Sequence, residues 1–80
     1  MSAFHLTVAS VGEIKFEGEA DSATFPGVAG EFTVLAHHEP LVSTLRAGTM
    51  LVRDTKGGKH VFEISTGVVE VSHNHAIVLM

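Results

Sequence analysis

The chain has 80 residues, a net charge of −4 with neutral histidines, and no cysteine. This length corresponds to one small domain, and the lack of cysteine excludes disulfides and thiolate metal ligands. The five basic residues are dispersed and there is no Trp or Tyr, so nucleic-acid binding, which needs clustered positive charge, is not expected.

Nothing in the sequence predicts a segment that enters a membrane. The first residues, Met1-Ser2-Ala3, have neither the charged nor the apolar region of a signal peptide. The longest apolar run begins at Ala76 and is far shorter than the roughly 20 residues that a membrane-spanning helix needs. We therefore expect any contact with a membrane to be made through a partner.

The dominant hydrophobic period is two, which is the period of a β-strand. Residues 4–8 alternate apolar and other side chains, which places His5 on the outer face of the first strand. A second alternating run covers residues 14–21, and Gly18 within it predicts a bulge or a division of the strand.

The segment from Pro26 to Leu41 holds both prolines of the chain. Its composition predicts an irregular loop at Pro26-Gly27, a short strand over residues 32–35 and a second sharp corner at Pro40. No nucleophile and no pair of carboxylates accompanies this shape, so we interpret the segment as a surface for a partner.

The second half of the chain has the pattern of a β-meander. Strands are predicted at residues 50–53, 59–65, 68–72 and 75–79, with glycine-containing or polar turns between them. No long window shows the 3.6-residue period of a helix. The sequence therefore predicts an all-β sandwich or barrel with essentially no helix. Its expected core is Phe4, Leu6, Val8, Ile14, Phe16, Phe32, Val34, Leu45, Val52, Phe62, Ile64, Val69, Val71 and Ile77.

Histidine is the main candidate for chemistry, with six copies. His73 and His75 are two apart, so a strand would place them on one face, as in the His-x-His metal site of the cupins. The cupin pattern also needs a later carboxylate and a further histidine, and no strong ligand follows His75. A small metal-binding β-barrel enzyme remains the alternative hypothesis. The other interpretation is a polar turn with Asn74 at positive φ.

In their order and spacing, several short motifs together resemble the N-terminal domain of the ATP synthase epsilon subunit, over about Phe4 to Leu79. The central motifs are Pro26-Gly27, Gly30-Glu31-Phe32, Val34-Leu35, His38 and Pro40-Leu41, followed by Leu45 and Gly48. The flanking ones are Phe4-His5-Leu6-Thr7-Val8, Phe16-x-Gly18, Gly67-Val68-Val69-Glu70-Val71, Asn74 and Val78-Leu79.

The resemblance implies a single domain over residues 1–80, built as a flattened ten-stranded β-sandwich of two sheets. It also implies a non-catalytic subunit of the F1F0 ATP synthase central stalk, without cofactor or metal. Such a subunit binds the gamma subunit and the c-ring and couples ion translocation to rotary ATP synthesis. Its expected location is the cytoplasmic face of the bacterial inner membrane or an equivalent energy-transducing membrane, as a peripheral part of the complex.

The resemblance further assigns contact residues. Those facing the c-ring, whose loops are basic in this family, are Val28, Ala29, Gly30 and Glu31, with Glu31 forming charge-assisted hydrogen bonds. Those facing gamma are His38, Leu41, Val42 and Ser43, with Ser10 expected nearby.

The chain departs from the family pattern at two places. His37 stands where many members have glycine, so we expect the backbone there to avoid positive φ or His37 to accept modest strain. The family usually continues into a C-terminal helical hairpin that can inhibit ATP hydrolysis and in some members binds ATP. This chain stops at Met80, so the hairpin is expected to be absent and neither role is carried over.

Overall fold

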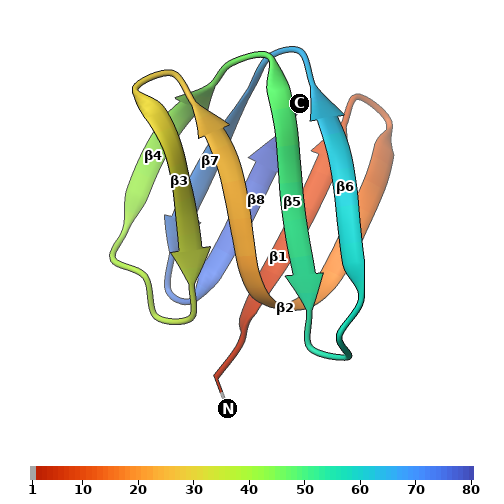
Figure 1. Ribbon diagram of the computed structural model, residues 1–80, viewed down its shortest axis with the longest axis vertical. Helices are drawn as coiled ribbons and strands as arrows, with labels where there is room; N and C mark the ends of the chain where they lie inside the picture. Colours follow the sequence, from red (N-terminus) through yellow and green to blue (C-terminus); the bar gives the residue numbers. More distant parts are fainter. Residues whose placement is uncertain (1) are drawn as a thin grey trace.

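The computed structural model describes residues 2–80, and every regular element in them is a β-strand (Figure 1). No helix long and apolar enough to cross a membrane occurs in these residues. The strands are β1 (Phe4–Ser10), β2 (Glu13–Gly27), β3 (Gly30–Leu35), β4 (Leu41–Leu45), β5 (Gly48–Asp54), β6 (Lys59–Ile64), β7 (Gly67–Ser72) and β8 (His75–Leu79).

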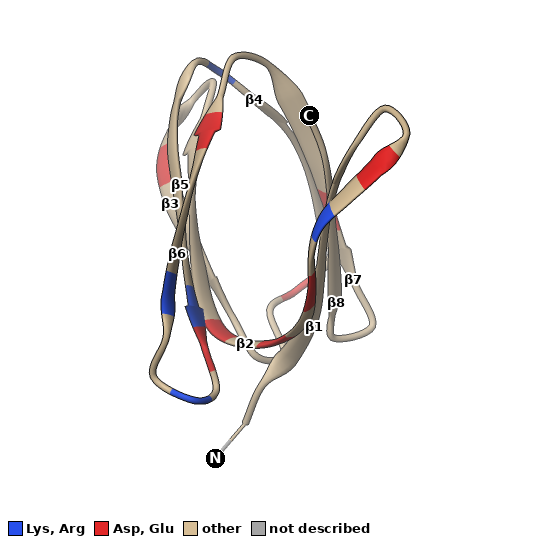
Figure 2. Cartoon of the chain, turned by 90° about the vertical axis from the view of Figure 1, so that its right-hand side faces the viewer, with Lys and Arg blue, Asp and Glu red and all other residues tan. Residues whose placement is uncertain are grey.

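The strands form two layers, seen edge-on in Figure 2. One layer contains β4, β7, β8, β1 and the first half of β2, and the other contains β3, the second half of β2, β5 and β6. β1 and β8 pair in parallel, and the other pairs are antiparallel. The predicted all-β, two-layer fold is confirmed. Residues 2–80 form eight strands rather than ten, in part because β2 runs unbroken for 15 residues and serves both layers.

β2 passes from one layer to the other at a β-bulge. Residues 13–20 pair with β1, whereas the residues from Ser22 onward pair with β3 and β5. The register with β5 shifts between Ala20 and Ser22, and such an extra residue bends the strand and increases its twist. The sequence predicted this irregularity at Gly18, which is wrong, because Gly18 lies in regular register opposite Leu6.

The core lies between the two layers. Its buried apolar side chains are Phe4, Leu6, Val8, Ala20, Ala23, Phe25, Val34, Leu45, Met50, Val52, Ile64, Val69, Val71, Ala76 and Val78. Three further residues predicted for the core, Phe16, Phe32 and Phe62, are partly buried and pack against it.

Two residues predicted for the core instead face outward. Ile14 is 61% exposed because the β1–β2 register shifts between Val8 and Ala9, which pairs Ile14 with the outward-facing Ala9. Ile77 is 37% exposed, and its neighbours Ala76 and Val78 are buried instead. Residues 76–79 are all apolar, so their sequence does not indicate which alternate set faces the core.

Gly27 ends β2 at a point of close approach. A Cβ atom there would lie 2.7 Å from the carbonyl oxygen of Gly30 and 2.9 Å from the Phe32 ring. The carbonyl belongs to the paired strand β3, so it cannot move aside without disturbing the hairpin. Only glycine fits this position without a shift.

We predict that Gly27→Ala lowers the free energy of unfolding by about 1–3 kcal/mol, the usual cost of overpacking. Gly18→Ala is the matched control, since its added Cβ would meet nothing closer than 4.0 Å, and it should leave stability unchanged or slightly raised. Urea unfolding of both variants measures the difference. Equal stability of the two variants would show that the close approach at Gly27 is not a constraint.

Candidate functional site

The turn between β2 and β3 forms a tight, exposed hairpin at one end of the molecule (Figure 1). It contains the four residues assigned to the c-ring, all of them exposed: Val28, Ala29, Gly30 and Glu31. The Val28 amide donates to the Thr44 carbonyl (3.1 Å), and the Arg46 amide donates to the Pro26 carbonyl (2.9 Å). The hairpin is therefore braced against the end of β4.

The loop between β3 and β4 lies at the end of β3 opposite to the β2–β3 hairpin (Figure 1). The His38 amide donates to the Leu35 carbonyl (3.2 Å), which closes a four-residue turn with His37 in its third position. His37 has φ 62°. The expectation that the backbone avoids positive φ is therefore wrong, and the other expectation, that His37 accepts the strain, holds. The half-buried His38 places Nδ1 2.8 Å from the Glu39 carbonyl oxygen.

The three residues assigned to gamma on β4 point to different sides of the strand. Leu41 is partly buried and packs against the core, whereas Val42 is 71% exposed on the outer face. Ser43 is half-buried and its hydroxyl donates to the Thr44 carbonyl at 3.2 Å. Among the three, Val42 is the side chain most available to a partner.

Ser10, the fifth residue assigned to gamma, lies at the end of its strand that is far from His38. β1 begins at the end of the molecule where the His5 amide donates to the Asn74 carbonyl (3.1 Å). The His37 amide bonds the Asn74 side chain at that same end. Ser10 is the last residue of β1, at the far end of the strand.

Exposed apolar side chains gather on the outer face of the β4-β7-β8-β1 layer. The strand registers place them in two rows, one through Val42, Glu70, Ile77 and Thr7, the next through Thr44, Val68, Leu79, Ala9 and Ile14. Val42, Ile14 and Leu79 are 71%, 61% and 54% exposed. We define the apolar face as Ala9, Ile14, Val42, Val68, Ile77 and Leu79. Exposed apolar side chains that gather on one face, here with Glu70 between Val42 and Ile77, are typical of a site that binds another protein.

The outer face of the other layer carries charge among its apolar residues. Val61 is 57% exposed and lies opposite Leu51, and the adjacent row pairs Arg53 with Lys59. Three of the five basic residues belong to the β5–β6 hairpin, as Figure 2 shows: Arg53, Lys56 and Lys59. Basic side chains thus occur on this layer, whereas the charged residue within the rows of the apolar face is the acidic Glu70.

The histidines do not assemble a metal centre in the described part of the chain. His73 lies in the β7–β8 turn with φ 52°, whereas His75 lies on β8 with Nε2 3.5 Å from the Thr7 hydroxyl. His5 stacks edge-on against His75, with ring centroids 4.8 Å apart, and its two nitrogens face Glu17 and Glu19 at 3.5 and 3.2 Å. Within residues 2–80 no group of three or more His, Cys, Asp or Glu is arranged to hold a metal ion. The metal-enzyme alternative therefore has no support from this geometry.

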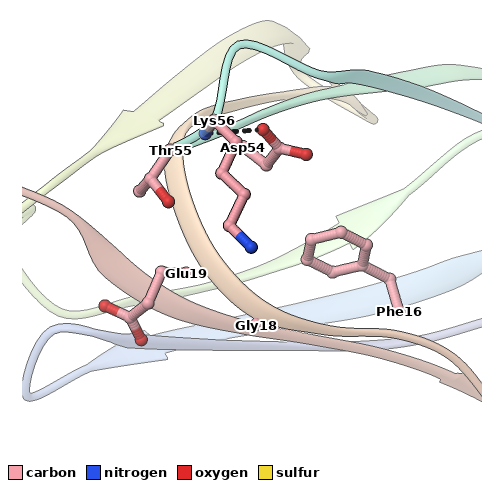
Figure 3. A pocket seen from close by; sticks show the side chains of 6 residues that line it. All are labelled: Phe16, Gly18, Glu19, Asp54, Thr55 and Lys56. Atoms are coloured by element: carbon pink, nitrogen blue, oxygen red, sulfur yellow. Dashed lines mark hydrogen bonds between the residues drawn. The ribbon is translucent and has the colours of Figure 1, made fainter.

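A hollow of about 350 Å³ lies beside the β5–β6 turn (Figure 3) and is lined by Phe16, Gly18, Glu19, Asp54, Thr55 and Lys56. Asp54 Oδ1 accepts hydrogen bonds from the Lys56 and Gly58 amides (2.8 and 2.7 Å), and Oδ2 lies 2.8 Å from His60 Nε2. The His60 side chain, followed by these two amides, lowers the pKa of Asp54 below its ordinary value of 3.8. The carboxylate thus holds the turn together.

Comparison with known proteins identifies the family. The sequence model of one protein family, described as the ATP synthase delta/epsilon chain β-sandwich domain, matches residues 3–80. The chain belongs to this family.

Curated relatives in the family are ATP synthase epsilon chains. That of Afipia carboxidovorans is 42% identical over 99% of this chain and 57% of its own length, and that of Bordetella parapertussis is 39% identical over 99% and 56%. The chain therefore spans less than two thirds of the length of these relatives. A chain in the Euglena gracilis mitochondrial ATP synthase structure (OSCP/F1/c-ring) has the same fold, with a TM-score of 0.93, 26% identity, and coverage of 100% of this chain and 51% of that one.

These comparisons support the epsilon-type β-sandwich that the sequence motifs indicated. They do not assign individual contact residues, so the c-ring and gamma residues named above stay predictions. The apolar face was missed at the sequence level, since its members come from β1, β2, β4, β7 and β8. Only the strand register brings them together, and the register was not known from the sequence.

The Asp54 interactions make stability depend on pH. A depressed folded-state pKa stabilises the fold above the ordinary value of 3.8, and this contribution is lost as the pH falls through the folded-state pKa. We predict that Asp54→Asn is less stable than the wild type at pH 7, and that this gap shrinks as the pH is lowered below 3.8. Urea unfolding of both proteins between pH 7 and pH 2.5 measures this difference in stability.

Glu39→Gln is the control for the pH series, because it removes the same charge from an exposed loop residue. It should follow the wild type throughout. A gap between the wild type and Asp54→Asn that stays constant down to pH 2.5 would contradict the assigned role of Asp54.

Proposed function

We propose that the chain is a non-catalytic central-stalk subunit of an F1F0 ATP synthase, which binds the gamma subunit and the c-ring and couples ion translocation to rotary ATP synthesis. Its membership of the delta/epsilon family supports this, as does its likeness to a chain of the Euglena gracilis complex. In a bacterium it would lie on the cytoplasmic face of the inner membrane, and it would meet the membrane only through the complex.

The main structural support for this proposal is the apolar face. Val42, already assigned to gamma, lies within it, and Ser10 follows its member Ala9 on β1. His38 lies in the loop that leads into β4. A surface with several apolar side chains and a few polar ones, here including Glu70, has the composition of a protein interface. We assign this surface to gamma.

The β2–β3 hairpin supplies the second contact. It projects Val28, which is 60% exposed, and Glu31 beside it on β3. A carboxylate binds most strongly to a cationic donor through a charge-assisted hydrogen bond. A partner with basic polar loops, as expected of the c-ring in this family, therefore fits this hairpin.

The fold also suits the transmission of torque. The strands that carry the two contact surfaces pack on the same core, and β2 takes part in both layers. Neither surface can therefore move far relative to the other without disturbing buried packing. A small domain with marginal stability of its own also gains stability when a partner binds the folded state.

We predict that the purified chain binds isolated gamma and that Val42→Lys weakens this binding by tenfold or more, because it places a charge in an apolar contact. Val61→Lys is the matched control, since Val61 is a similarly exposed strand residue on the opposite layer (57% against 71%), and it should bind like the wild type. Titration calorimetry measures all three affinities. Failure of the folded wild type to bind gamma would reject the proposed function, and equal loss in both variants would reject the choice of face.

We predict that Glu31→Lys weakens attachment to c-ring membranes more than attachment to gamma, because it reverses the charge on the hairpin. Glu39→Lys makes the same change of charge in the exposed β3–β4 loop, at the other end of β3, and should leave attachment to the c-ring unchanged. Sedimentation with stripped membranes and binding to isolated gamma measure the two attachments. Equal weakening of both by Glu31→Lys would argue against the assignment of the two surfaces.

A further inference from the structure

Three non-glycine residues in the described chain have positive φ: His37 (62°), His73 (52°) and Asn74 (59°). A non-glycine residue in this region is strained when nothing nearby favours the conformation. Direct hydrogen bonding links the loop that contains His37 to the turn that contains the other two. Within residues 2–80, the non-glycine residues with positive φ are therefore gathered at one end of the sandwich.

The β7–β8 turn explains two of the three. Ser72 pairs with His75, so His73 and Asn74 form a two-residue hairpin loop. Such a loop, with positive φ at both positions, matches the twist of the strands, and asparagine is among the residues that best adopt it. Asn74 is therefore placed by the hairpin itself, independently of the β3–β4 loop.

The Asn74 residue joins three segments. Its side-chain oxygen accepts a hydrogen bond from the His37 amide (2.7 Å), and its side-chain nitrogen donates to the Ala3 carbonyl (2.8 Å). Its main-chain carbonyl accepts from the His5 amide at 3.1 Å. Both functional groups of the side-chain amide are used.

The bond to His37 is made where the β3–β4 loop is strained. Glycine would take the φ of 62° without cost, but histidine does not, so the conformation needs an interaction that favours it. The short bond from the His37 amide to Asn74 supplies one. The turn that it holds sets the path of the chain into His38 and Glu39.

We propose that Asn74 is a positioning residue for binding of gamma: its side-chain oxygen holds His37 in the left-handed conformation and so keeps the β3–β4 loop, with His38, in its binding shape. This inference rests on the proposed function, in which that loop borders the gamma contact. Asn74 itself need not touch the partner.

Two variants separate the bonds of Asn74. Asn74→Gly retains positive φ and the main-chain bond to His5 but removes the side chain. Asn74→Asp retains an oxygen for the His37 amide, but it replaces the donor to the Ala3 carbonyl with a charged carboxylate oxygen, so that bond is lost. We expect Asn74→Gly to weaken binding to isolated gamma by about fivefold, the equivalent of one hydrogen bond, and Asn74→Asp to bind within twofold of the wild type.

Amide hydrogen exchange supplies a readout that does not depend on gamma. In Asn74→Gly the His37 amide should exchange faster than in the wild type, while the amide of buried Val52 stays protected; in Asn74→Asp both should match the wild type. Wild-type affinity in Asn74→Gly, or equal loss of affinity in both variants, would overturn the proposal. If the wild type itself does not bind gamma, the proposed function fails, and exchange at His37 still decides whether Asn74 holds the loop.

Discussion

The structure depends on one strand that belongs to both layers. β2 pairs with β1 in its first half and with β3 and β5 in its second half, and a bulge between Ala20 and Ser22 turns it from one layer to the other. Because the same backbone contributes to both sheets, the layers are covalently and cooperatively joined along the core. An isolated pair of sheets held only by apolar packing could slide more easily.

The positions of the two proposed contacts follow from that strand. The second half of β2 ends at Gly27, whose close approach to β3 fixes the hairpin that carries Glu31. The first half of β2 pairs with β1 and so completes the layer whose outer side is the apolar face. β4 connects the two regions, since the hairpin is braced against its last residues and Val42 lies near its start. Movement of one contact relative to the other would break hydrogen bonds in β2 or β4.

Much of the fold could be predicted from the sequence because period-two alternation is strong where polar residues separate the apolar ones. Phe4, Leu6 and Val8 were placed correctly for this reason. The burial of Ile77 was predicted wrongly because its neighbours are also apolar, so the sequence does not indicate which residues face the core. The burial of Ile14 was predicted wrongly because a bulge changes which side of the strand faces the core. The left-handed conformation of His37 could not be predicted either, because it is favoured by a side chain 37 residues away, Asn74.

The two candidate surfaces also differ in how well the sequence could predict them. The β2–β3 hairpin is local, so its residues could be named from consecutive positions. The apolar face is assembled from five strands, so the sequence pointed to Val42 but not to Ile14, Val68 or Leu79. The proposed partners come from the resemblance to the family, whereas the residues of the apolar face were found only from the strand register.

We propose that gamma and the c-ring bind to separate surfaces of one rigid domain. A direct measurement is the attachment of the labelled chain to c-ring membranes as isolated gamma is added in increasing amounts. If the surfaces are separate, gamma is recruited to the membranes together with the chain, so both sediment in equal amounts. Release of the chain from the membranes by gamma would show instead that the two partners compete for one surface.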